Sequence, residues 1–165
     1  MGQYLHIADF QNPLERVERV ALQRDWQAER GGDDEVVLAV PFEPGELSMS
    51  FVWRADLESL HLASLYANRV PQQRRDEMGK LINLVNEQLI YGHFDMWRQD
   101  GSVMFRNSLI LAGGAEFGEA QCEALIETAI EACERYYAAF QFAIWAGEPA
   151  EKAIETSFFG AVGRA

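Results

Sequence analysis

The chain has 165 residues, and 14 Lys and Arg set against 26 Asp and Glu give a formal net charge of −12 at pH 7. This acidic balance argues against a nucleic-acid binder and against a protein of anionic membrane surfaces, because both need basic side chains to neutralise phosphates. Hydrophobic residues make up 48% of the chain. Length and composition therefore predict one folded domain with a continuous core, and they exclude a disordered chain.

No targeting or membrane segment is expected. Residues 1–11 hold no basic cluster followed by an apolar run, and no stretch reaches the roughly 18 uninterrupted apolar residues of a spanning helix. We expect a cytoplasmic protein in which residues 1–11 are a flexible N-terminal segment. Cys122 and Cys133 lie on one predicted helix, about 16 Å apart along its axis, so they cannot pair and are expected to be buried.

The first half of the chain reads as a helix followed by antiparallel strands. Asn12, Pro13 and Glu15 are typical of a helix start, and the helix is expected over residues 13–25. From Leu47 to Arg54, apolar and polar residues alternate with the period of a strand that is buried on one face. We expect three or four strands in all, over residues 26–30, 36–42, 47–54 and 58–66.

Helical periodicity returns twice in the second half. Apolar residues spaced by three and four predict a helix from Pro71 to Gly92, and a longer helix is predicted over residues 119–146, ended by Gly147. A weaker pattern after Pro149 suggests a short terminal helix. The core stripe of the long helix is expected to contain Cys122, Leu125, Ile126, Ala129, Cys133, Tyr136, Tyr137, Phe140 and Ile144.

Between these helices, the dipeptide Asp100–Gly101 indicates a hairpin of strands 93–98 and 102–111, with a two-residue turn. One face of this hairpin is expected to belong to the core. In the predicted register, the residue pairs of the outer face are Asp95 with Arg106 and Trp97 with Met104.

The order of elements is helix, strands, helix, strand pair, helix, which is an α+β two-layer plan with an antiparallel sheet. We assign residues 12–147 to a single domain and residues 148–165 to a short C-terminal helix or tail.

No pattern of catalytic, cofactor-binding or metal-binding residues stands out. The motifs of a nucleophilic hydrolase are missing, and a phosphate at Gly113–Gly114 would be repelled by the neighbouring Glu116 and Glu119. We therefore expect no catalytic residue, no cofactor and no metal. The histidines do not form a metal-binding spacing, since they are scattered at His6, His61 and His93.

Phe142 and Trp145 point away from the core stripe of the long helix, at about 100° per residue. Either Phe158 and Phe159 fold back from the tail to cover them, or a second chain does. Trp97 and Met104 are also expected to be uncovered, on the outer hairpin face, where Asp95 and Arg106 flank them. Because Trp and Met are common at interfaces, we interpret these six side chains as candidates for a dimer or partner interface: Trp97, Met104, Asp95, Arg106, Phe142 and Trp145.

A row of glutamates follows one side of the long helix. A solvated face explains such a row most simply, and a docking face for a basic protein partner is the functional interpretation. The row consists of Glu119, Glu123, Glu127, Glu131 and Glu134.

The chain resembles the YbjN family of bacterial sensory transduction regulators. The resemblance rests on VPQQRRDEMGKLINLVNEQLIYGHFDMWRQDGSVMFRNSLILAGG at 70–114 and on ALIETAIEACERYYAAFQFAIWAG at 124–147, together with Trp26, the Trp53 strand and the Leu-His-Leu of residues 60–62. It extends from about residue 12 to residue 147.

This resemblance implies a fold similar to the dimeric chaperones of type III secretion, and a regulatory or protein-binding role without defined chemistry. We therefore predict a non-enzymatic, chaperone-like homodimer that binds other proteins. The alternative is a small-molecule sensor or enzyme with a pocket between sheet and helices.

Overall fold

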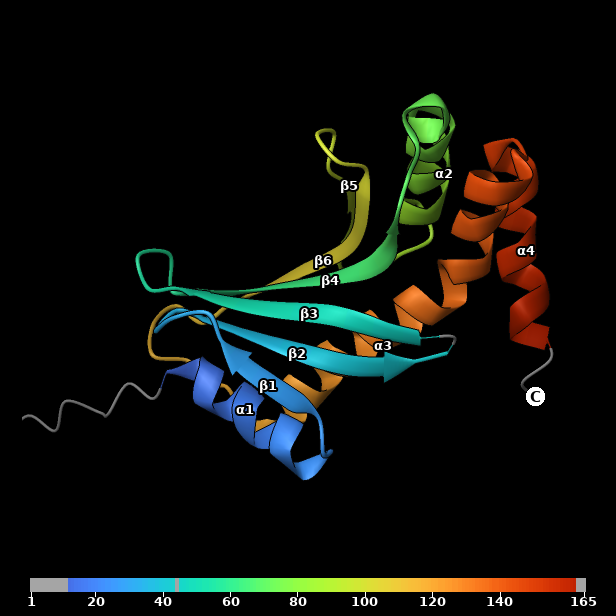
Figure 1. The fold of residues 1–165 in the computed structure, drawn as a ribbon. Helices are drawn as coiled ribbons and strands as arrows, with labels where there is room; N and C mark the ends of the chain where they lie inside the picture. Colours follow the sequence, from blue (N-terminus) through green and yellow to red (C-terminus); the bar gives the residue numbers. More distant parts are fainter. Residues whose placement is uncertain (1–11, 44, 163–165) are drawn as a thin grey trace, which may run out of the picture.

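The computed structural model describes residues 12–43 and 45–162, with side chains up to Phe158. The expected segment 1–11 and the side chain of Phe159 lie outside the described residues. The fold is α+β, as predicted (Figure 1). Its elements are α1 (Pro13–Gln23), β1 (Gln27–Arg30), β2 (Glu35–Phe42), β3 (Gly45–Arg54), β4 (Ser59–Arg69), the short η1 (Gln72–Arg74), α2 (Arg75–Asn86), β5 (His93–Met96), β6 (Ser102–Ile110), α3 (Glu119–Gln141), the π-helical turn η2 (Phe142–Ala146) and α4 (Ala150–Val162).

The six strands form one sheet in the order β1-β2-β3-β4-β6-β5, and every neighbouring pair is antiparallel. Figure 1 shows α1 and α3 beneath the sheet, while α2 stands beside β5 and α4 packs against α2 and α3. The helices therefore cover one face of the sheet, which explains why its strands alternate between buried and exposed residues.

The core lies between the sheet and α3. Leu47, Met49, Phe51 and Trp53 all face it and are buried, as their alternation predicts. Aromatic rings fill the centre of this layer, where the ring centroids of Phe94 and Phe140 are 4.9 Å apart. The predicted stripe of α3 is confirmed, with eight of its nine residues buried and Tyr137 half-buried: Cys122, Leu125, Ile126, Ala129, Cys133, Tyr136, Phe140 and Ile144 are the buried ones.

The second helix is shorter than the sequence predicts, because Asn86 ends it instead of Gly92. The Asn86 side chain binds the backbone of Phe94 twice: its Nδ2 donates to the Phe94 carbonyl at 3.0 Å, and its Oδ1 accepts from the Phe94 N–H at 2.7 Å. Residues 87–92 then turn the chain into β5, and Gly92 has a φ of +67°. A polar contact with the next strand thus replaces the last turn of the predicted helix.

The predicted register of the hairpin is wrong by two residues. The loop has four residues, 98–101, and Trp97 donates its N–H to the Ser102 carbonyl at 2.9 Å. Gly101, at φ +78°, accepts a hydrogen bond from the Val70 N–H, and a Cβ there would lie 2.3 Å from the Val70 carbonyl oxygen. Because the shift is an even number, each side chain keeps its predicted face, but Asp95 lies opposite Met104.

Side chains of η1 and α2 hold the junction between α3 and α4. Gly147 ends the π-helical turn at φ +67°, and Arg74 Nε donates to the Ala143 carbonyl at 2.9 Å. The Glu77 carboxylate accepts the Ala150 N–H at 2.7 Å, and this hydrogen bond lowers the pKa of Glu77. These contacts direct α4 back along α2, where Ala150, Ala153 and Ile154 are buried.

Candidate functional site

The first candidate surface lies on the β5–β6 hairpin, and we define the hairpin surface as Asp95, Trp97 and Arg106. Trp97 is 55% exposed. Beside it, Arg106 Nη1 and Asp95 Oδ2 form an ion pair at 3.1 Å, with both side chains nearly half exposed. Met104, predicted to share this surface, is only 2% exposed. Trp97 with the neighbouring ion pair, and not Met104, is therefore open to a partner.

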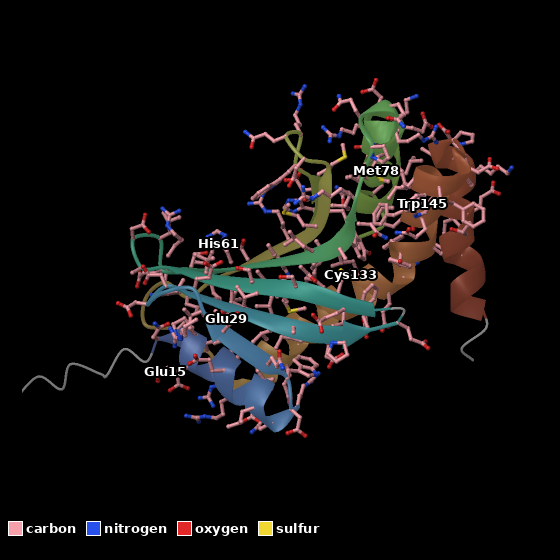
Figure 2. All side chains as sticks on the ribbon, in the orientation of Figure 1. Glu15, Glu29, His61, Met78, Cys133 and Trp145 are labelled. Atoms are coloured by element: carbon pink, nitrogen blue, oxygen red, sulfur yellow. The ribbon has the colours of Figure 1, made fainter. Side chains whose placement is uncertain are left out.

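The second candidate surface is the helix-end surface, defined as Phe142 and Trp145. Both belong to the π-helical turn η2, in which Ala143 and Ile144 face the core. Phe142 is 45% exposed and Trp145 is 73% exposed, while the indole Nε1 of Trp145 donates to Gln141 Oε1 at 2.6 Å. Figure 2 labels Trp145 at this end of α3. The prediction that Phe142 and Trp145 point away from the core stripe, made from the helical rotation of about 100° per residue, is thus confirmed.

The C-terminal helix does not cover the helix-end surface. Up to Phe158, the apolar side chains that α4 buries are those of Ala150, Ala153 and Ile154, and Phe158 is itself 47% exposed. Of the two alternatives for covering Phe142 and Trp145, cover by Phe158 is therefore wrong, because the bend at Gly147 directs α4 onto α2 and α3. The Phe159 half of that alternative lies outside the described side chains. Within the described residues, the two rings remain open to solvent.

The cysteines lack the environment of a nucleophile. Both are free and buried, and burial raises the pKa of the Cys122 and Cys133 thiols to about 12. Cys133 Sγ lies 3.7 Å from the Ser64 hydroxyl, and the Tyr66 hydroxyl donates to the Cys133 carbonyl oxygen at 2.6 Å. Burial also raises the pKa of Tyr66 well above its ordinary value. These groups are neutral near pH 7 and serve as buried packing groups.

This environment predicts that the folded protein resists thiol reagents. At about pH 8, a thiol with a pKa of about 12 is a thiolate roughly once in ten thousand molecules. We expect no labelling of the native chain by a chromogenic disulfide reagent, and labelling of both cysteines once denaturant is added. Rapid labelling of either thiol in the folded chain would contradict the assigned burial.

The glutamate row on α3 has a structural role at one of its positions. Glu127 forms an ion pair with Arg24, which follows α1, and so ties the two helices together. Arg24 also lies over the ring of Trp26, 5.0 Å from its centroid. Glu131 is exposed, while Glu123 and Glu134 are half-buried. One member of the row therefore holds α1 on α3, so the row is not wholly a docking face.

The described histidines are not brought together. The His61 Nδ1 lies 3.1 Å from the Ser108 hydroxyl on the face of the sheet without helices, and His93 lies opposite Arg106 at the start of β5. His6 lies outside the described residues. From residue 12 onward, the described part of the chain contains no group of three or more His, Cys, Asp or Glu residues that could hold a metal ion.

The two edge strands of the sheet differ in whether side chains occupy their outer backbone groups. The sequence did not indicate this difference. The Asn86 side chain occupies the outer backbone groups of Phe94 in the edge strand β5. The edge strand at the other side, β1, has four exposed residues. In the sequence, Asn86 is a polar residue beside the apolar stripe of its helix. Its true role depends on Phe94, which no local pattern links to it.

Two surface concavities accompany these features. One, of about 430 Å³, lies over β1, β2 and β3, and one of about 590 Å³ lies beside the start of α1. The alternative function requires a pocket between sheet and helices, whereas neither concavity lies there. The large side chains that fill this layer are Phe51, Phe94, Phe105, Tyr136 and Phe140.

Residues 13–142 match the family model YbjN, described as "Putative bacterial sensory transduction regulator". The chain belongs to the YbjN family. Comparison with curated proteins and with solved structures gave no match. Within the described residues, no helix combines the length and the apolar character needed to cross a membrane. YbjN membership fits a regulatory or binding role and assigns no chemistry to any residue.

Proposed function

We propose that this YbjN protein is a cytoplasmic, non-enzymatic regulator that acts as a chaperone-like homodimer by binding other proteins. The observation that carries the proposal is the exposure of Trp97 beside an ion pair on the hairpin, and of Phe142 together with Trp145 at the end of α3. Tyr91 and Phe158 are also exposed, but neither belongs to these two surfaces. Aromatic rings bury a large apolar area at a low cost in side-chain entropy, and they are enriched at interfaces.

The hairpin surface suits a contact between two copies of the chain. Asp95 and Arg106 carry opposite charges side by side on the same face, as an ion pair. In a two-fold symmetric contact, the Arg106 guanidinium of one copy would approach the Asp95 carboxylate of the other, and the two Trp97 rings would pack near the axis. A self-complementary patch of this kind is what an isologous interface requires.

The helix-end surface suits a different protein partner. Phe142 and Trp145 lie together on η2, and the chain as a whole carries a net charge of −12. Such a charge attracts basic partners over long distances and raises their rate of association. We therefore assign a basic partner protein to this end of the molecule, with the aromatic rings as its apolar anchors.

Affinity capture with the full chain as bait tests the proposal. A partner recovered from the source organism should be lost with the Phe142→Ser, Trp145→Ser double variant, because the aromatic anchors are removed. It should be retained with the control Leu22→Ser, Leu57→Ser, which removes two other exposed apolar side chains. Equal recovery with both variants would contradict the assigned surface.

A further inference from the structure

The β5 edge of the sheet is closed to further strands. Because Trp97 and Ser102 form a hydrogen-bonded pair, Phe94 and Met96 direct their backbone groups away from β6. The Asn86 amide binds both of these groups at Phe94, and the Asp95 carboxylate accepts the Met96 N–H at 2.9 Å. Side chains thus occupy the positions that another strand would need.

The β1 edge has no such closure. The Gly31 N–H donates to the Glu35 carbonyl, so that Gln27 and Glu29 are in the positions that bond to β2. Ala28 and Arg30 consequently direct an N–H and a C=O each away from the sheet. All four residues of β1 are exposed, and no hydrogen bond of the described residues occupies these outward groups. The sheet can therefore be extended at β1.

The concavity of about 430 Å³ lies directly beside this edge. Its floor includes Val37 and Ala39, whose side chains lie on the face of the sheet without helices. Glu29 and Glu46 lie at its margin, and among the described residues neither carboxylate forms an ion pair. Figure 2 labels Glu29 on β1. An open backbone edge, a small apolar floor and two unneutralised carboxylates thus meet at one place.

We propose that the β1 edge binds an extended, basic peptide segment of a partner protein as an additional strand of the sheet. The peptide would exchange backbone hydrogen bonds with Ala28 and Arg30, while its Lys or Arg side chains reach Glu29 and Glu46. The methylene stems of these basic side chains would lie toward Val37 and Ala39, which share the face of Glu29, while the alternate residues of the peptide point to the opposite face. This inference rests on the proposed protein-binding function and adds a second site with a defined partner chemistry.

A second copy of this chain is a poorer occupant of the same edge. Two β1 strands paired across a two-fold axis would bring the Glu29 carboxylates of both copies onto the same face and close to each other. Like charges in neighbouring positions of a sheet are destabilising. A basic partner reverses this interaction from repulsion to attraction.

The test uses the full chain and a fluorescently labelled peptide in which lysine and valine alternate, titrated at low salt and followed by fluorescence anisotropy. Ala28→Pro removes an outward N–H without breaking a bond to β2, and proline is tolerated on an edge strand. Glu29→Lys with Glu46→Lys reverses the charge of the site. The matched control is Glu151→Lys with Glu155→Lys, which changes the net charge equally at exposed positions on α4.

We expect saturable binding that weakens about tenfold in Ala28→Pro and by more than that in the charge-reversed variant, with the control weakened less than either. A peptide with glutamate in place of lysine should not bind. Absence of binding to the wild type, or equal affinity of wild type and Ala28→Pro, would overturn the proposal. So would a dimer that Ala28→Pro dissociates, since it would assign the edge to a second copy. Because none of these variants alters Trp97, Phe142 or Trp145, failure here leaves the tests of the proposed function unaffected.

Discussion

Truncation of the chain after Gly147 is expected to lower the free energy of unfolding by about 3 kcal/mol or more. The change removes α4, whose Ala150, Ala153 and Ile154 are buried, and it also removes the hydrogen bond between the Ala150 N–H and Glu77. Burial of a side chain of the size of Ile154 contributes about 1.5–3 kcal/mol by itself, and the apolar surfaces of α2 and α3 that α4 covers would be exposed as well.

Thermal unfolding measures this effect. For a chain of this size, a loss of about 3 kcal/mol corresponds to a fall in Tm of roughly 6–12 °C. The control Phe158→Ser, at an exposed position of α4, should leave Tm nearly unchanged. Tryptophan emission should shift little on truncation, because Trp145 is already 73% exposed in the full chain. A truncated protein that melts like the full chain would contradict the packing of α4.

Gly92→Ala is expected to cost about 3 kcal/mol, which is the largest effect of a single substitution predicted here. A Cβ at this position would lie 2.3 Å from Cζ of Phe105 and 2.6 Å from the Arg106 carbonyl oxygen, and the backbone has a φ of +67°. The positive φ costs about 1–2 kcal/mol for an L side chain, and overpacking against Phe105 adds about 1–3 kcal/mol.

Gly113→Ala separates these two contributions. Gly113 has a φ of +76°, but a Cβ there would meet nothing within 4 Å. We therefore expect a loss of about 1 kcal/mol, from the backbone conformation alone. Both values follow from denaturant unfolding of the full chain. Equal losses for the two variants would show that the contact between residue 92 and Phe105 is not tight.

Much of the fold could be predicted from the sequence, because its strands and helices are marked by local periodicity. The alternation from Leu47 to Trp53 and the stripe from Cys122 to Ile144 both arise from one-sided burial, which is recorded in the order of the residues. The glycine at position 147 also marked the end of the long helix correctly.

The errors occur where distant residues determine the local structure. Asp100 and Gly101 satisfy the pattern of a two-residue turn, but a hydrogen bond from Val70 to Gly101 favours a four-residue loop. The helix α2 ends at Asn86, whose side chain forms hydrogen bonds with the backbone of Phe94. Arg74 donates to the Ala143 carbonyl and so helps to direct α4 away from Trp145. Such contacts join residues that no local period relates.

The candidate surfaces were predicted only in part, because local spacing gives the direction of a side chain but not its distant contacts. Helical spacing is enough to show that Phe142 and Trp145 leave the core, and strand parity places Trp97 on the outer face of its hairpin. Neither rule could show that Met104 is buried on that face, or that β1 is the open edge of the sheet. The burial of Met104 and the open edge at β1 both depend on the order of the strands in the sheet and on contacts between side chains of different strands.

The homodimer is tested most directly by light scattering of the full chain over a range of micromolar concentrations. We predict a mass of about twice 18.7 kDa for the wild type and a mass near 18.7 kDa for Trp97→Ser, with the control Tyr91→Ser, also at an exposed aromatic position, unchanged from the wild type. A wild-type mass of 18.7 kDa at every concentration would contradict the proposed homodimer.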